Sequence, residues 1–368
     1  MVLIFLIMNK RDKYIVSSLI SLTALSAIIL NVYFTFFHRY KGKVVIDEWN
    51  ESRVFNDKDV TYINKDPNKD FVILNLADVQ LCDTENYFNA SIVHDEMTYL
   101  VNETKPDLIT LTGDQTWSNE NLVSLKRIIK WLDEYKIPWA PVFGNHDYGN
   151  GFNSAVASME YCSDLYEAGK YSLYKRGPTN FETLGNYAIV IKENNKILKA
   201  LYMVDSGYLD KINDDQISYF EWISEGLKQK NNDNYVDSMV FLHKPLPEYS
   251  LAYHHYREYK DNAIGDVHVH FSLSGSIQNG FFFKMKDKGM KDVICGHQHG
   301  NSFTLIHEGV RLTNAVKTSE TMSYYDDGII NLNGASTFVL KGNEVNIKNY
   351  FVGSKEYHLS DDLNVYNW

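Results

Sequence analysis

Side chains that can bind metal ions follow several short apolar segments of this sequence. In each case an apolar run stops abruptly, and the next residues offer a carboxylate, an amide or an imidazole. A lone Asp after such a run is usually a turn residue or a helix cap, and a lone His in a loop is usually a surface residue. Repetition of the arrangement at five places along the chain is harder to explain in that way, and it indicates one shared site. The residues concerned are Asp78, Gln80, Asp114, Asn145, His146, His243, His297 and His299.

The apolar runs before these residues have the length of buried strands. Helical stretches at 89–104 and 122–135 separate the first three runs, and such alternation is typical of an α/β sheet. The carboxyl ends of the strands in such a sheet share one edge, where ligands bind. We therefore expect the side chains named above to meet at that edge. The predicted strands are 71–78, 107–112, 139–143, 238–242 and 292–295.

The remaining part of the chain predicts further strands and one more helix. Residues 187–191 and 200–205 are strand-like and flank Asn194-Asn195, which predicts a hairpin. Residues 216–228 have one apolar stripe and are expected to form an amphipathic helix. Short β segments with Gly punctuation are expected between residues 303 and 351.

The polar residues stand in a pattern that resembles a known enzyme family. The blocks are Asp78-Val79-Gln80, Gly113-Asp114, Gly144-Asn145-His146-Asp147, His243 and Gly296-His297-Gln298-His299. They look like the five signature blocks of the calcineurin-like metallophosphoesterases, and the resemblance extends from about residue 70 to about residue 350. Within that family, the run His243-Lys244-Pro245-Leu246-Pro247-Glu248 is similar to the purple-acid-phosphatase-like branch. The resemblance implies a four-layer α/β/β/α sandwich of two mixed sheets.

The resemblance also implies how the ligands divide between two metal ions. Asp114 would bridge the ions, because a carboxylate has two oxygens. Mixed nitrogen and oxygen ligands favour Mn, Fe, Zn or Co over Ca. We therefore expect two divalent ions, or one trivalent and one divalent ion, with Mn, Fe and Zn foremost, and a bridging hydroxide as the nucleophile. One site would be completed by Asp78, Gln80 and His299, and the other by Asn145, His243 and His297.

Four residues in or near these blocks depart from the usual ligands or have another expected role. The family usually has His where this chain has Gln80, and a neutral amide oxygen is a weaker ligand than imidazole. His146 would donate to the leaving-group oxygen or to the developing charge. Asp147 would orient the ring of His146, or else serve only as a turn or helix cap. Trp117 stands where purple acid phosphatases carry a Tyr ligand, so we expect no tyrosinate-to-iron absorption.

The reaction expected from this pattern is hydrolysis of a phosphate ester, with a phosphomonoester favoured. A phosphodiesterase or pyrophosphatase of the same fold is the close alternative, and a catalytically inactive metal-binding protein is a rival of another class. The chain has no Gly-rich phosphate loop, GxSxG elbow or HExxH helix. Its net charge of -11 argues against nucleic-acid binding through a basic surface.

An uncharged apolar segment, residues 15–37, lies near the N-terminus. As a helix it would be about 35 Å long, enough to cross a bilayer core of about 30 Å. We therefore expect a membrane anchor, with a cleaved signal peptide as the alternative. Basic residues flank both ends equally. A single N-terminal anchor usually delivers a large downstream domain to the non-cytoplasmic side, and glycosylation triplets at Asn50, Asn89 and Asn102 fit that side.

The chain is accordingly divided into four parts. They are an N-terminal anchor (1–40), a polar tether (41–67), a metallophosphoesterase domain (68–353) and a C-terminal tail (354–368). The hydrophobic content of 44% is enough for one large domain or two small ones. The three cysteines are far apart in the sequence and are expected to be small buried apolar residues.

Overall fold

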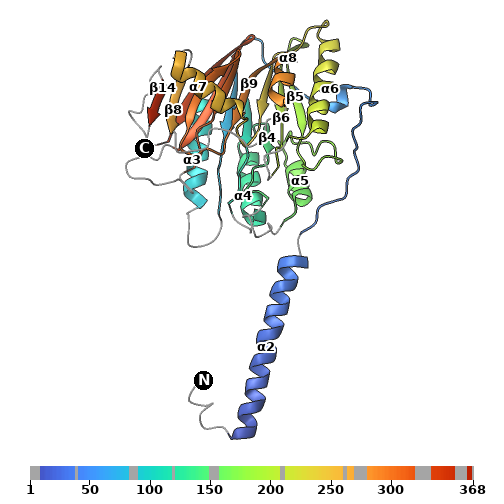
Figure 1. The fold of residues 1–368 in the computed structure, drawn as a ribbon, viewed down its shortest axis with the longest axis vertical. Coiled ribbons are helices and arrows are strands. Elements are labelled where there is room, and N and C mark those ends of the chain that lie inside the picture. Colours follow the sequence, from blue (N-terminus) through green and yellow to red (C-terminus); the bar gives the residue numbers. More distant parts are fainter. Residues whose placement is uncertain are drawn as a thin grey trace.

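The computed structural model shows a mixed α/β domain and one long helix that stands apart from it (Figure 1). The long helix is α2 (Lys10–Phe37). The structure describes residues 9–37, 40–82, 90–117, 121–148, 157–207, 212–259, 263–268, 280–319, 333–352 and 363–366.

The domain contains two mixed β-sheets. The strands are β1 (Thr61–Asn64), β2 (Phe71–Leu76), β3 (Leu108–Thr112), β4 (Trp139–Val142), β5 (Tyr187–Glu193), β6 (Lys196–Met203), β7 (Ser238–Phe241), β8 (Ile264–His268), β9 (Met290–Cys295), β10 (Ser302–His307), β11 (Val310–Asn314), β12 (Gly334–Lys341), β13 (Glu344–Phe351) and β14 (Leu363–Tyr366). The smaller sheet has the order β13-β12-β2-β3-β4, and the larger has the order β1-β5-β6-β7-β9-β11-β10-β8-β14. Strands β2, β3 and β4 run parallel in the smaller sheet, and β6, β7, β9 and β11 run parallel in the larger.

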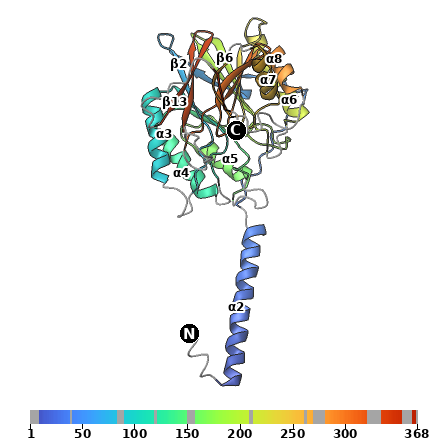
Figure 2. The same ribbon diagram turned by 60° about the vertical axis from the view of Figure 1, so that its left-hand side comes forward.

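Helices cover the outer sides of both sheets. They are α3 (Ala90–Thr104), α4 (Asn121–Glu134), α5 (Met159–Ala168), α6 (Asp214–Lys230), α7 (Glu248–Tyr259) and α8 (Phe281–Asp287), with a short 3-10 helix η1 (Asp57–Asp59). Figure 2 shows α3 and α4 on one side of the two sheets and α6, α7 and α8 on the other. The buried residues of α3 and α4 pack with the smaller sheet, and those of α6, α7 and α8 pack with the larger.

Alternation of side chains along the central strands explains this layering. Met239 and Phe241 of β7 belong to the core that the two sheets share, whereas Val240 packs with the helices outside the larger sheet. In β5, Ile189 and Val190 divide in the same way. Successive residues of a strand point to opposite faces, so a strand covered on both faces must be apolar throughout. This is why the sequence shows these strands as continuous apolar runs.

The expected two mixed sheets and the expected hairpin are confirmed. Strands β5 and β6 pair antiparallel on either side of Asn194-Asn195. The φ angles of Asn194 and Asn195 are 50° and 64°. A two-residue hairpin turn requires such left-handed angles, and Asn tolerates them better than most residues.

The interpretation of residues 41–67 as a tether is wrong. Strand β1 pairs in parallel with β5 and forms an edge of the larger sheet. Trp49, only 5% exposed, packs against Phe181 and Tyr219. The segment is polar because it lies along the outside of the domain, and β1 is only partly buried. Likewise, β14 pairs with β8, so residues 363–366 of the expected tail belong to the larger sheet.

Helix α2 has the composition of a membrane span. Within the part of the chain that the structure describes, Lys10–Ile29 is the one stretch long and apolar enough to cross a bilayer, and none of it is buried. A signal sequence near an N-terminus has the same composition.

Candidate metal centre

The predicted ligand residues meet at the edge where the parallel strands of both sheets end. Four of them have a left-handed backbone, with φ of 52° at Asp78, 47° at Gln80, 52° at Asp114 and 71° at His297. Such angles cost non-glycine residues on the order of 1–3 kcal/mol each and are concentrated at functional sites. The chain thus turns sharply after β2, β3 and β9, which brings these side chains to the edge.

Glycines in the signature blocks let the ligands approach closely. A Cβ on Gly113 would lie 2.6 Å from His243 Nδ1, and one on Gly144 would lie 2.2 Å from Asp114 Oδ1. Neither position has room for any side chain. The glycines before the ligands are therefore required by packing within the site, and not only by the turn.

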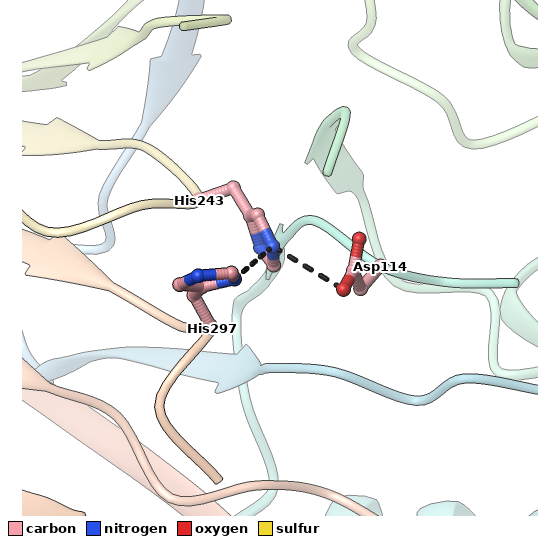
Figure 3. Close-up of side chains that lie close together, drawn as sticks. All are labelled: Asp114, His243 and His297. Carbon is pink, nitrogen blue, oxygen red and sulfur yellow. Dashed lines mark hydrogen bonds and ion pairs between the residues drawn. The ribbon is translucent and has the colours of Figure 1, made fainter. Parts of the chain in front are cut away.

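Asp114, His243 and His297 form a compact cluster of potential metal ligands. One ligand atom from each lies within 4.8 Å of the others, and Figure 3 shows the three side chains converging from different strands. His243 Nε2 is 3.3 Å from Asp114 Oδ2 and 3.2 Å from His297 Nδ1. Asn145 Oδ1 also lies 3.0 Å from His243 Nε2. Carboxylate, amide and imidazole groups are therefore gathered around one point, as a transition-metal ion requires.

The other predicted ligands lie next to Asp114 or Asp78. Gln80 Nε2 donates to Asp114 Oδ2 at 3.3 Å, and His299 Nε2 lies 3.3 Å from Asp78 Oδ1. Gln80 Oε1 is buried and accepts no hydrogen bond, and the buried Asp78 Oδ1 faces the imidazole of His299. Buried polar atoms without a hydrogen bond are rare in folded proteins, because leaving them unsatisfied costs free energy. A cation held by these two oxygens would satisfy both, so the donor set fits a metal ion here.

The charges of the cluster are consistent with metal binding. Burial alone would raise the pKa of Asp114, but His243 and His146 hold it well below its ordinary value. Burial would lower the pKa of His243, yet Asp114 raises it to about 9. Burial, together with the charge of His243, lowers the pKa of His297 to about 3. Asp114 is thus ionised and His297 neutral, as ligands must be, and a metal ion would replace the proton on His243.

Groups behind the ligands hold them in place. The ring of His243 is oriented by its Nδ1, which lies 2.9 Å from Thr112 O and leaves Nε2 facing the cluster. The ammonium group of Lys317 is fully buried and donates to Asp78 O and Ser319 O, each at 2.8 Å. Ser319 Oγ donates to Val79 O at 2.6 Å. The segment after β11 therefore supports the strained Asp78–Gln80 loop, and sequence reasoning missed this role.

His146 lies at the side of the cluster, against an aromatic ring. Its backbone N donates to Asp114 Oδ1 at 2.8 Å, and its Nε2 is 3.8 Å from Asp114 Oδ2. Its side chain is 22% exposed, whereas that of Asp114 is 1% exposed. The ring centroids of His146 and Trp117 are 3.9 Å apart, with an angle of 39° between the planes. Trp117 thus occupies the expected tyrosine-ligand position and packs on His146.

The carboxylate of Asp147 ties two loops together. Its Oδ1 accepts from Thr116 N at 3.0 Å and from Thr116 Oγ1 at 3.1 Å, and its Oδ2 accepts from Gly144 N at 2.9 Å. These contacts match the alternative reading of Asp147 as a turn cap. Burial, and then the charge of Asp114, raise the pKa of Asp147 to about 7.

A further acidic residue near the site was not singled out from the sequence. Asp205, just after β6, accepts a hydrogen bond from Tyr148 OH at 2.5 Å and another from Gly207 N at 2.8 Å. Burial raises the pKa of Asp205 to about 7, although the Tyr148 hydrogen bond opposes the shift. The signal was present, because Asp205 also ends a strand-like segment. Its pairing with the residue after the Gly144–Asp147 block required the tertiary structure.

The fold and this arrangement of residues are typical of phosphoesterases that use two metal ions. The chain belongs to the calcineurin-like phosphoesterase family, since its residues 71–301 match the model of that family. Members of this family use a dinuclear metal centre. The resemblance drawn from the signature blocks is therefore confirmed.

Curated relatives support the purple-acid-phosphatase-like branch. The chain is 27% identical over 241 residues to the protein named probable inactive purple acid phosphatase 29 from Arabidopsis thaliana, which covers 59% of this chain and 60% of that protein. It is 29% identical over 223 residues to phosphatase DCR2 from Saccharomyces cerevisiae, which covers 55% of this chain and 37% of that protein. The chain thus spans less than two thirds of either relative.

A solved structure shares the fold. A dimetal phosphatase from Danio rerio superposes with a TM-score of 0.50 at 12% identity, covering 76% of this chain and 95% of that one. At this identity the likeness concerns the fold alone.

Proposed function

We propose that this chain hydrolyses phosphate esters, with phosphomonoesters favoured, at a centre of two metal ions. The observation that carries the proposal is the pair of buried oxygens, Asp78 Oδ1 facing His299 and Gln80 Oε1 without a hydrogen bond, next to the Asp114, His243 and His297 cluster. Two groups of donors that share one carboxylate fit two cations. When bound, the ions would supply positive charge for the phosphoryl oxygens and activate water for attack.

The contacts of Asp114 support a division of the ligands into two sets. Its Oδ2 is 3.3 Å from Gln80 Nε2 and 3.3 Å from His243 Nε2, so it contacts both groups. We assign Asp114 as the bridging ligand. One ion would be held by Asp78, Gln80 and His299, and the other by Asn145, His243 and His297.

Mn, Fe and Zn are the metals that this mixed set of nitrogen and oxygen ligands would favour. Gln80 contributes a neutral amide oxygen, which neutralises less charge than a carboxylate and binds more weakly than an imidazole. We therefore propose that the site with Gln80 is the weaker of the two.

His146 is the residue that we assign to proton donation. Its ring is partly exposed beside the buried Asp114, so it can reach a substrate that enters the site. It would donate a proton to the leaving oxygen, or stabilise charge there, which contributes about 10²–10⁴-fold to the rate in comparable enzymes. The contacts of Asp147 support a role in holding the turn that presents this ring.

A metal-binding protein without turnover is the second candidate. The relative from Arabidopsis thaliana is named a probable inactive phosphatase, and Gln80 departs from the usual ligand set. Phosphodiester and pyrophosphate hydrolysis are the alternatives within the enzyme class.

The deciding experiment is a phosphate-ester panel with the full chain. The protein is purified in detergent, stripped with a chelator and reloaded with Mn, Zn or Fe, and an aryl phosphate, a bis-aryl phosphate and pyrophosphate are compared. We expect metal-dependent turnover that is fastest on the monoester. Asp114→Asn should abolish it and lose one or both ions, whereas Asp95→Asn, an exposed acid on α3, should change neither. Binding of metal without turnover of any ester would favour the inactive protein, and retention of both ions by Asp114→Asn would contradict the bridging role.

We further propose that α2 anchors the protein in a membrane with the domain on the non-cytoplasmic side. Its apolar side chains are exposed along Lys10–Ile29, which suits a lipid environment. Asn50 and Asn102, the two glycosylation positions within the described residues, are both exposed. A glycosidase-sensitive mass shift that is smaller in Asn50→Gln and in Asn102→Gln, and lost when Asn89 is replaced as well, tests the side.

A further inference from the structure

The chain that leaves α2 is attached to the domain at the segment before α5. Tyr40, three residues after the end of α2, pairs with Ala157, and its carbonyl accepts a hydrogen bond from Ser158 N at 2.9 Å. Its ring packs on Tyr161, with centroids 5.5 Å apart. Figures 1 and 2 both show α2 meeting the domain at the end where α4 and α5 lie. The attachment point is therefore a fixed part of the fold.

Hydrogen bonds connect this attachment point to the block that carries His146. Ala157 N donates to Asn121 Oδ1 at 3.1 Å, and Asn121 Nδ2 donates to Asp147 O at 3.3 Å. A single side chain at the start of α4 thus joins the residue beside Tyr40 to the residue beside His146. The end of α2 and the edge of the metal centre consequently lie on the same side of the domain.

The distance between the apolar helix and its attachment point on the domain is short. The uncharged segment ends at Phe37, and three residue steps of about 3.8 Å place Tyr40 at most about 11 Å from it. A folded domain of 100 residues has a radius of gyration of about 13 Å, so none fits into that gap. A lipid headgroup is small enough to fit into that gap. If α2 crosses a bilayer, the catalytic edge is held at the bilayer surface.

The residues after α2 have the chemistry of a membrane interface. Tyr40 is 51% exposed, Val44 91% and Ile46 80%, although each is apolar or aromatic. Lys41 and Lys43 stand among them. Tyrosine is enriched where proteins enter the headgroup region, and long lysine side chains near the end of a membrane helix extend to the same level. Exposed apolar side chains directly after an apolar helix are thus explained by contact with lipid.

We propose that the substrate of the metal centre is a phosphoester carried by a lipid of the membrane that holds α2. This inference rests on the proposed function and on the proposed anchor, and it names the substrate class. In the reaction, the oxygen of a water molecule bonds to phosphorus, and the proton that this water loses passes to solvent, from which His146 is reprotonated after turnover. The P–O bond to the lipid alcohol breaks, and the alcohol leaves with a proton from His146.

The test uses the full chain in phosphatidylcholine vesicles that contain phosphatidic acid. Release of phosphate from phosphatidic acid, or of headgroup from phosphatidylcholine, is compared with hydrolysis of nitrophenyl phosphate by the same vesicles. A rigid helical spacer of about 20 residues inserted between residues 37 and 40 would lift the domain by about 30 Å. A flexible Gly/Ser linker of the same length is the matched control, because it can fold back to the surface.

We expect the rigid spacer to lower lipid turnover at least tenfold and the flexible linker to lower it less. Hydrolysis of nitrophenyl phosphate should be unchanged in both. Val44→Asp should lower lipid turnover alone, because it places a charge at the interface. The inference is overturned if the rigid spacer leaves lipid turnover unchanged, if both linkers act equally, or if the purified chain lacks α2. Turnover of a soluble phosphopeptide as fast as that of vesicle lipid would also overturn it. Absence of nitrophenyl phosphate hydrolysis with every metal would instead reject the proposed function, and this inference with it.

Discussion

Removal of the Trp117 indole is expected to slow the reaction by releasing the ring of His146. The two ring centroids are 3.9 Å apart. Trp117 N also donates to Leu81 O at 3.3 Å, and this backbone contact is kept in any substitution. Trp117 therefore acts as a positioning residue for His146, and Trp117→Ala removes the contact without removing the proton donor.

The size of the effect follows from the energy of the ring contact. An aromatic pair contributes about 0.5–1.5 kcal/mol beyond its burial. Because about 1.36 kcal/mol corresponds to a factor of ten in rate, kcat should fall by about 2- to 12-fold in Trp117→Ala. Trp117→Phe keeps a ring at this position and should lose less. His146→Ala should lose far more, on the order of 10²–10⁴-fold.

The assay is a double-mutant cycle on metal-loaded protein. The four proteins are the wild type, Trp117→Ala, His146→Ala and the double variant, measured on an aryl phosphate and on an alkyl phosphate. If Trp117 acts through His146, the Trp117→Ala change costs nothing further in the His146→Ala background. The loss in Trp117→Ala should also be larger for the alkyl phosphate, whose poor leaving group needs the proton more.

A control separates this role from loss of packing in general. Trp222→Ala removes an indole that packs on Trp49, Phe55 and Tyr219, away from the metal centre. It should lower stability without altering the leaving-group dependence. An equal loss from Trp117→Ala with and without His146 would refute the reasoning, because Trp117 would then act through the fold.

Three further predictions concern the metal site, its colour and pH. Gln80→His should tighten binding at the weaker site by about tenfold, or about 1.4 kcal/mol; a metal titration with unchanged affinity would contradict the assignment of Gln80. Iron-loaded protein should show no tyrosinate-to-iron band, since Trp117 replaces the tyrosine, and a visible band would disprove this point. Asp205 has a folded pKa of about 7, above its ordinary 3.8. Its contribution to stability is therefore full below about pH 4 and is lost as the pH rises to about 7. Over this window it lowers the free energy of unfolding by up to about 1.4 kcal/mol per pH unit. Urea unfolding of Asp205→Asn should therefore show a flatter pH dependence in this window, and an unchanged slope would contradict the shift.

Much of the fold could be predicted because its signals are local. The strands before Asp78, Asp114 and His243 are buried on both faces and appear as continuous apolar runs. The hairpin at Asn194-Asn195 was recognisable because few residues accept the backbone angles that its turn requires. In both cases the residue types respond to constraints within a few positions of the chain.

The errors occurred where structure depends on distant partners. Strand β1 is polar and half-buried, and it becomes a strand only by pairing with β5, more than a hundred residues later. Trp49 is buried by Phe181 and Tyr219, which also lie more than a hundred residues later in the chain. A segment at the margin of a sheet has one uncovered side, so its sequence has no continuous apolar run to reveal it.

The metal centre shows the same division. The sequence by itself determined the ligand types and their order, because ligand chemistry requires carboxylates, amides and imidazoles at strand ends. It also determined that Trp117 cannot replace a tyrosine oxygen. Only the tertiary structure decided that Trp117 packs on His146, that Lys317 supports the Asp78 loop, and that Tyr148 bonds to Asp205. These contacts join separate strands, and no pattern within one segment of the chain specifies which side chain will lie across from it.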